Sequence, residues 1–134
     1  MSNALFDTTK GNLFQTGFSF KDFNLPVRPG LPYSLDLSTN DFQGDLDIPK
    51  IREFIVEKGG CENIYLVMLT LTSNNIGGQP VSMKNIKECH ALCREFQIPL
   101  WFDGCRINEN AYFIKKYEPG YQSTDVRDII KEMF

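Results

Sequence analysis

The sequence predicts an α/β fold in which mostly parallel strands are flanked by helices. Two continuous apolar runs of strand length, residues 64–69 and 98–103, are separated by a stretch with helical spacing of its apolar side chains. A strand covered on both faces has a continuous rather than an alternating apolar pattern, so both runs are expected to be buried. Strand, loop, helix and strand form a βαβ unit, whose strands should be parallel with a right-handed crossover.

The first 35 residues lack helical spacing and are rich in Phe, Gly and Pro. We expect short strands and turns over residues 1–35, followed by the βαβ unit and further helices over residues 36–134. Five phenylalanines need burial, which predicts that this segment lies against a larger body. The phenylalanines and the residues that punctuate the segment's end are Phe6, Phe14, Phe18, Phe20, Phe23, Pro26, Pro29, Gly30 and Pro32.

A first clear helix is predicted from residue 47. Asp47 is a good N-cap, Pro49 suits a first helical turn, and Gly59-Gly60 is a typical end. The isoleucines that recur on one face of this helix are Ile48, Ile51 and Ile55.

A second helix should begin after Ser82, which is a suitable N-cap. Residues 107–117 and 124–134 predict two more helices, separated by Pro119-Gly120. The chain therefore reads as the interior of a fold that continues at both ends, because two strands and four helices are too few to cover such apolar faces. The apolar positions of the second helix are Met83, Ile86, Cys89 or His90, Cys93 and Phe96, and those of the last are Val126, Ile129, Ile130, Met133 and Phe134.

Charge, hydropathy and cysteine content argue against nucleic-acid and membrane partners and for a cytoplasmic protein. The formal net charge is −3 with a pI near 5.1, whereas nucleic-acid binding needs a basic face, so no nucleic-acid partner is expected. No apolar run reaches membrane-spanning length and no signal peptide is visible, so we expect no membrane partner. Four cysteines without a secretion signal indicate reduced thiols and a cytoplasmic protein.

A zinc site is a weaker alternative for the cysteines. Cys89 and Cys93 lie one helical turn apart with His90 beside Cys89, but a structural zinc site needs four ligands. The pattern is more typical of buried structural thiols, and no metal ligand is predicted.

Polar residues follow both predicted strands. The loop 72–80 leaves the first strand and Asp103-Gly104-Cys105-Arg106 leaves the second. Because ligands of α/β sheets bind beyond the carboxyl ends of parallel strands, Asn74, Asp103 and Arg106 should converge on one small ligand. A carboxylate suits a protonated ring nitrogen, and an amide with a guanidinium suits an oxyanion. Pyridoxal 5′-phosphate (PLP) carries both groups on one ring, although D-x-x-R alone is more typical of a surface ion pair.

Three longer segments make this interpretation specific. Residues 72–82 resemble the TSNxxGGQPVS segment of tryptophanases and tyrosine phenol-lyases. Residues 103–115 resemble their D-x-x-R-x-x-ENAYFIK segment, and residues 2–11 are similar to SNxxFDTTxG. The chain is therefore identified as similar to the β-eliminating lyase family over essentially all 134 residues, more weakly between residues 12 and 60.

The resemblance implies part of the large domain of a fold-type I PLP enzyme. It implies that Asp103 pairs with the pyridine nitrogen and that Arg106 and Asn74 lie near the phenolic oxygen. Asn74 would also serve the substrate carboxylate, and Phe6 would stack on the ring. Family members are cytoplasmic homo-oligomers that use a monovalent cation. They convert an aromatic amino acid to pyruvate, ammonia, and indole or phenol.

One departure concerns the Schiff-base lysine, which the family carries in a downstream Ser-x-Lys-Lys stretch. Only Lys115, Lys116 and Lys131 follow Asp103, and none stands in such a stretch. The family's phosphate-binding loop and small domain are not matched either. We therefore expect a truncated lyase that is inactive alone and has no catalytic residue of its own. The alternative is a non-catalytic remnant that binds a partner through exposed helix faces.

Further polar residues of the third matched segment are better explained as part of a structural helix. Their helical spacing favours a helix that packs its Tyr and Phe side chains inward over a set of site residues. They are Glu109, Asn110, Tyr112 and Lys115.

Overall fold

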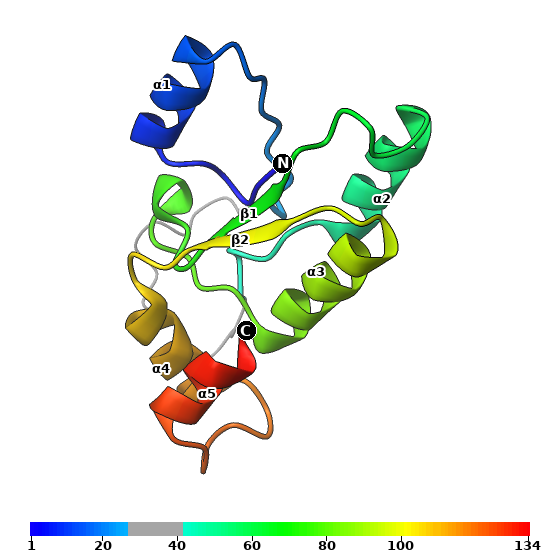
Figure 1. The fold of residues 1–134 in the computed structure, drawn as a ribbon. Coiled ribbons are helices and arrows are strands. Elements are labelled where there is room, and N and C mark those ends of the chain that lie inside the picture. The colour runs from blue at the N-terminus through cyan, green and yellow to red at the C-terminus, as the bar shows by residue number, and fades with distance from the viewer. Residues whose placement is uncertain (27–41) are drawn as a thin grey trace.

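The computed structural model describes residues 1–26 and 42–134 (Figure 1). Strands β1 and β2 lie in the middle of this view, with α1 above them, α2 at the right, and α3, α4 and α5 below them. In chain order the elements are α1 (Asp7–Gln15), α2 (Ile48–Glu57), β1 (Val67–Thr70), the 3₁₀ turn η1 (Asn74–Ile76), α3 (Met83–Glu95), β2 (Leu100–Asp103), α4 (Ile107–Tyr117) and α5 (Val126–Glu132).

The two strands are parallel, as predicted. Val67 pairs with Leu100 and Thr70 pairs with Asp103. The ladder begins later than predicted, at Val67, whose N–H donates to the carbonyl of Pro99 at 2.9 Å, because Pro99 has no N–H to donate to the chain before Val67. An isolated parallel bridge joins Ser2 to Met68, so β1 lies between the N-terminal segment and β2.

Burial confirms the prediction for Val67 and Leu69 of the first run, but Tyr65 of that run is exposed, and the prediction is wrong for β2. Val67, Leu69 and Thr70 are buried, whereas Trp101 in β2 is 59% exposed. Within the described residues β2 pairs only with β1, so it forms an edge of the sheet. Phe102 points to the helix side, where its ring meets that of Phe134 at 5.2 Å, and alternation places Trp101 on the other face.

The predicted starts of α2 and α3 are confirmed by their side-chain caps. The Asp47 carboxylate accepts from the N–H of Lys50 at 3.2 Å. The Ser82 hydroxyl accepts from the N–H of Asn85 at 3.0 Å. Each cap satisfies an N–H that the helix itself leaves unpaired. Gly59 follows α2 with a φ of +77°, a left-handed conformation that favours glycine.

The expectation of no helix in residues 1–35 was wrong. Helix α1 covers Asp7–Gln15, yet it buries no side chain and Phe14 is 84% exposed. An exposed helix leaves no apolar periodicity in the sequence, which is why this helix was missed.

The prediction that all five N-terminal phenylalanines are buried was also wrong, since only Phe23 is buried. The boundary at residues 35 and 36 lies outside the described residues, as do Pro29, Gly30 and Pro32.

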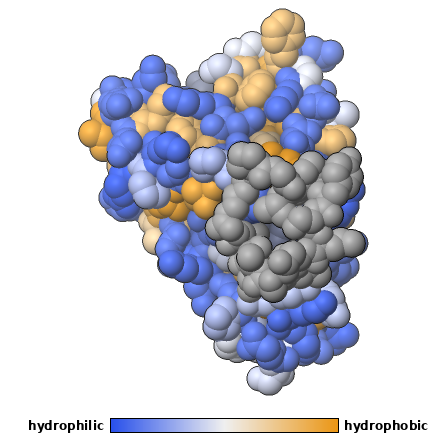
Figure 2. All heavy atoms as spheres, turned by 180° about the vertical axis from the view of Figure 1, so that it is seen from behind, coloured by the Kyte–Doolittle hydropathy of each residue, from blue (hydrophilic) through white to orange (hydrophobic). Residues whose placement is uncertain are grey.

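The main core lies between β1 and helices α2–α5. Ile51 and Ile55 of α2 are fully buried, as are Met83, Ile86 and Cys89 of α3. Cys93 is also buried, and both α3 thiols are free, as predicted. Seen from behind, hydrophobic residues show at several places among hydrophilic ones (Figure 2).

The last two helices close the bottom of the molecule in the view of Figure 1. Ile129 and Met133 of the predicted apolar face are buried, whereas Phe134 is 74% exposed. The prediction that α4 packs its Tyr and Phe inward is wrong for Tyr112, whose side chain is exposed. Phe113 does pack, with its ring 5.8 Å from that of Phe42.

Candidate functional site at the ends of the strands

Both predicted site loops leave the same edge of the sheet. Thr70 and Asp103 are partners at the carboxyl ends of the two strands. Beyond them, the N–H of Leu71 donates to the carbonyl of Asp103 at 2.9 Å. The carbonyl of Leu71 then accepts from the N–H of Arg106 at 2.8 Å. Leu71 therefore joins the two loops through backbone hydrogen bonds.

Asn74, Asp103 and Arg106, the three polar residues predicted to contact the ring, are all at least partly exposed. Asp103 is partly buried, and its carboxylate accepts from the N–H of Cys105 at 3.3 Å. Arg106, the N-cap residue of α4, is exposed, and Asn74, the first residue of η1, is partly exposed. Within the described part of the chain, no hydrogen bond or ion pair joins these side chains to one another. Their polar atoms are therefore available to a ligand.

The loop that carries Asn74 is held by its own backbone. Ser73 donates to the carbonyl of Gln79 at 2.8 Å, and its own carbonyl accepts from Gly78 at 2.9 Å. Gly77 and Gly78 have φ values of +83° and +72°. These glycines permit a tight turn, because other residues rarely adopt that conformation.

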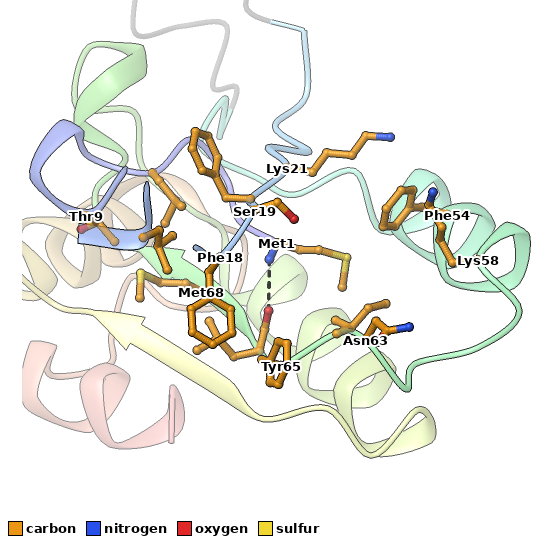
Figure 3. A pocket seen from close by; sticks show the side chains of 15 residues that line it. Met1, Thr9, Phe18, Ser19, Lys21, Phe54, Lys58, Asn63, Tyr65 and Met68 are labelled. Carbon is orange, nitrogen blue, oxygen red and sulfur yellow. Dashed lines mark hydrogen bonds between the residues drawn. The ribbon is translucent and has the colours of Figure 1, made fainter. Parts of the chain in front are cut away.

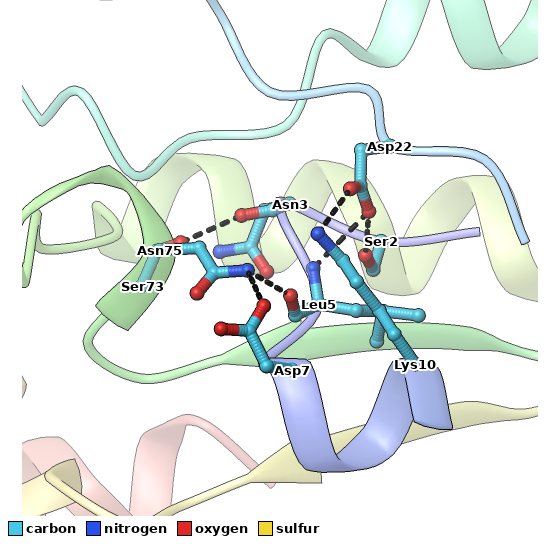
Figure 4. A network of polar contacts seen from close by, with 8 residues as sticks. All are labelled: Ser2, Asn3, Leu5, Asp7, Lys10, Asp22, Ser73 and Asn75. Atoms are coloured by element: carbon cyan, nitrogen blue, oxygen red, sulfur yellow. Dashed lines mark hydrogen bonds and ion pairs between the residues drawn. The ribbon is translucent and has the colours of Figure 1, made fainter. Parts of the chain in front are cut away.

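Phe6 lies next to this loop, although α1 was not foreseen. The side-chain amide of Asn75 donates to the carbonyl of Leu5, directly before Phe6 (Figure 4). Phe6 is the N-cap residue of α1 and is 39% exposed. The structure thus brings the Phe6 segment to the loop that carries Asn74, with an aromatic side chain still accessible.

Sequence reasoning missed three buried asparagines that act as backbone partners. Asn3 accepts from the N–H of Thr70 at 2.8 Å and donates to its carbonyl at 3.2 Å. Asn85 makes the same pair of bonds with Leu46, and Asn110 with Val81. Asn110 is therefore structural, in line with the helix interpretation. No local pattern marks such a residue, because the asparagine and its partner are at least 29 positions apart.

Two carboxylates meet the N-terminus of α3. Both oxygens of Asp45 accept from Ser82, at 2.7 Å from its N–H and 2.9 Å from its hydroxyl. Glu118 accepts from the N–H groups of Met83 and Lys84 at 2.7 and 2.9 Å. Burial raises the pKa of Asp45 to about 7, against the lowering effect of the bonds from Ser82. This cluster caps α3 and contains none of the predicted ligand-binding residues.

A separate apolar cavity of about 460 Å³ lies toward the amino end of β1 (Figure 3). Phe18, Tyr65 and Met68 line it, and Lys21 and Lys58 stand near Phe54 at one end. None of the four predicted site residues lines it. The cavity is therefore distinct from the strand-end site.

In residues 1–26 and 42–134, no three His, Cys, Asp or Glu side chains are grouped so that they could hold a metal ion. Among the same residues, no helix is both long enough and apolar enough to cross a bilayer.

Comparison with known proteins connects this geometry to a family. The family model described as "Beta-eliminating lyase" matches residues 1–134. This chain belongs to the β-eliminating lyase family. It is 39% identical to a tryptophanase of Salinibacter ruber over 133 residues, 99% of this chain and 27% of the relative. It is also similar to the tyrosine phenol-lyases of Fusobacterium nucleatum and Clostridium tetani, at 40% and 45% identity over 98% of this chain and 27% of each relative.

The β-eliminating lyases are fold-type I PLP enzymes, and the parallel strand pair with flanking helices agrees with that fold. The chain spans about 27% of the length of these relatives. The strand-end residues suit a PLP ring chemically. They offer a carboxylate for the ring nitrogen, an amide and a guanidinium for the oxyanion, and an accessible aromatic side chain.

Proposed function

We propose that this chain forms the ring-binding part of a PLP-dependent lyase that acts on an aromatic amino acid. The observation that carries the proposal is the register of the sheet, which pairs Thr70 with Asp103. Because the strands are parallel, the loop with Asn74 and the turn with Arg106 start at one edge. The names of the relatives, tryptophanase and tyrosine phenol-lyase, support the substrate class.

Each of the four residues has a definite role in this proposal. The Asp103 carboxylate keeps the ring nitrogen protonated, which makes the bound cofactor an electron sink for carbanion chemistry. Arg106 and Asn74 donate to the phenolic oxygen, and Asn74 also donates to the substrate carboxylate. Phe6 covers one face of the ring and excludes water from it.

We also propose that the full-length enzyme of which this chain would be a part is a homo-oligomer and uses a monovalent cation. Cytoplasmic location also belongs here as an expectation from the sequence.

The proposal is tested by the protonation state of a bound ring. The probe is ¹⁵N-labelled 4′-deoxypyridoxine 5′-phosphate, which lacks the aldehyde and therefore forms no covalent bond with surface lysines. In the complex with the unmodified chain, the ring ¹⁵N resonance should stay at its protonated position to a higher pH than in free solution. In Asp103→Asn this upward shift of the ring pKa should disappear.

The matched control is Asp128→Asn, which removes the carboxylate of an exposed aspartate of α5 that forms an ion pair with Lys131. This variant should keep the shift. An unchanged ring pKa in Asp103→Asn would contradict the role of Asp103, and failure of the unmodified chain to bind the probe at all would refute the ring-binding site.

A further inference from the structure

The backbone on both sides of Phe6 is held by side chains from two other segments. The N–H of Leu5 donates to the Asp22 carboxylate at 3.1 Å, and the carbonyl of Leu5 accepts from the amide of Asn75. The same Asn75 nitrogen lies 3.5 Å from the carboxylate of Asp7. Figure 4 shows Asn75 facing the chain just before and just after Phe6. We call these contacts of Asn75 with Leu5 and Asp7 the Asn75 clamp.

Packing holds the chain before Phe6, where Leu5 is buried, but not after it. Helix α1, which begins directly after Phe6, has no buried residue, and no side chain caps its N-terminus. A helix of nine residues without a buried face is marginal in water, so its position depends on what ties down its ends. The place of the Phe6 ring is therefore fixed by the burial of Leu5 on one side and by the polar contacts around Leu5 and Asp7.

Asn75 is itself held on a rigid support. It is the middle residue of η1, directly after Asn74. The hydroxyl of Ser73 donates to the carbonyl of Asn3 at 2.7 Å, and Asn3 is bonded to Thr70 at the end of β1. The clamp thus ties the Phe6 segment to the same loop that presents Asn74.

We propose that Asn75 is a positioning residue, which sets the distance between the Phe6 ring and a planar heterocycle held by Asn74, Asp103 and Arg106. This inference rests on the proposed function, since it needs a ring at the strand ends. Asn75 does not touch the ligand. It acts through Phe6, by fixing the backbone on either side of that residue.

The test is a double-mutant cycle with 4′-deoxypyridoxine 5′-phosphate as the probe. Loss of one well-placed aromatic contact should weaken binding roughly five- to tenfold, so Phe6→Ala and Asn75→Ala should each have an effect of that order. In the double variant, Asn75→Ala should add nothing to Phe6→Ala, because residues that act as one unit are not additive. Additive losses, or normal affinity in Asn75→Ala, would overturn the inference.

Two variants separate positioning from general damage. Asn75→Asp keeps the side-chain shape but loses the N–H donor, so it should weaken binding at least as much as Asn75→Ala. Asn12→Ala, in α1, removes an exposed asparagine side chain and should leave affinity unchanged. The circular dichroism induced in the bound ring should fall in Asn75→Asp relative to the unmodified complex, and retention of the full signal and affinity would contradict the role of the donor.

Amide hydrogen exchange distinguishes failure of this inference from failure of the proposed function. Asn75→Ala should speed exchange at Leu5 and Lys10, whose N–H groups bond to Asp22 and to the carbonyl of Phe6. Exchange at Leu71 in the sheet edge should not change. If the unmodified chain binds no probe, the proposed function fails. If Leu5 and Lys10 exchange at the same rate in Asn75→Ala, the clamp fails whether or not the probe binds.

Discussion

Thr70 and Asp103 are neighbours at the ends of two parallel strands, and Asn3 fixes Thr70 from the opposite side. The side chain of Asn3 bonds to both backbone groups of Thr70 and, at 2.9 Å, to the carbonyl of Gly44. The Asn3 side-chain amide therefore satisfies the backbone N–H and carbonyl of Thr70 that a neighbouring strand would otherwise pair with. The position of Thr70 at the end of β1 is therefore set both by the Asn3 side chain and by the pairing with β2.

Asn3→Ala is expected to lower the free energy of unfolding by about 3 kcal/mol, because it leaves buried backbone groups of Thr70 and Gly44 without partners. Urea denaturation of both chains measures the difference. Asn12→Ala, an exposed asparagine of α1, serves as the control and should change stability by less than about 0.5 kcal/mol. A loss in Asn3→Ala as small as in this control would show that water satisfies the freed groups.

Stability should depend on pH through Asp45. Burial, the largest cause, and the nearby carboxylates of Glu118 and Glu88 together raise its folded-state pKa from 3.8 to about 7, against the lowering effect of the bonds from Ser82. The protonated acid therefore favours the fold. Its contribution is complete below pH 3.8 and is lost as the pH rises through 7, by up to about 4 kcal/mol.

The measurement is the free energy of unfolding of the unmodified chain minus that of Asp45→Asn, across this pH range. Taking the difference removes the contributions of other carboxylates, several of which have lowered pKa values. The difference should decline as the pH rises. A flat difference from pH 4 to 8 would mean that Asp45 is ionised without penalty.

Local signals in the sequence were sufficient to predict the parallel pairing of the two strands and the starts of α2 and α3. The caps Asp47 and Ser82 and the continuous apolar run before Thr70 act within a few residues, so the chain itself reveals them. Helix α1 was missed because it buries nothing. The clamp of Asn75 on Leu5 spans 70 positions, and no short pattern encodes a contact of that range.

The isolated chain is expected to release no pyruvate from L-tryptophan or L-tyrosine, even with added PLP. The three lysines after Asp103 lie on α4 and α5, not at the strand ends. Lys115 donates to the carbonyl of Thr124 at 2.7 Å and Lys131 bonds to Asp128 at 2.9 Å. A lactate-dehydrogenase-coupled assay, with a full-length tryptophanase as positive control, measures this. Pyruvate release in proportion to the concentration of the chain would contradict it.

Two glycines should respond in opposite ways to replacement by alanine. A Cβ on Gly44 would lie 2.4 Å from the carbonyl oxygen of Gln79 and 2.6 Å from that of Pro80, both backbone atoms that cannot turn aside. The N–H of Gly44 also donates to Pro80 at 3.0 Å, so a shift would break this bond and disturb the loop after Asn74. Gly11, inside α1, has nothing within 4 Å of its ideal Cβ.

Gly44→Ala is therefore expected to lower the free energy of unfolding by about 2–3 kcal/mol, as in other overpacked sites. Gly11→Ala should raise it by up to about 1 kcal/mol, because alanine favours the helix and meets no obstacle. Thermal and urea denaturation of the two variants check both signs. If Gly44→Ala were as stable as the unmodified chain, residue 44 could not lie so close to the backbone of residues 79–80. The inference that this turn supports the loop of the candidate site would then also be wrong.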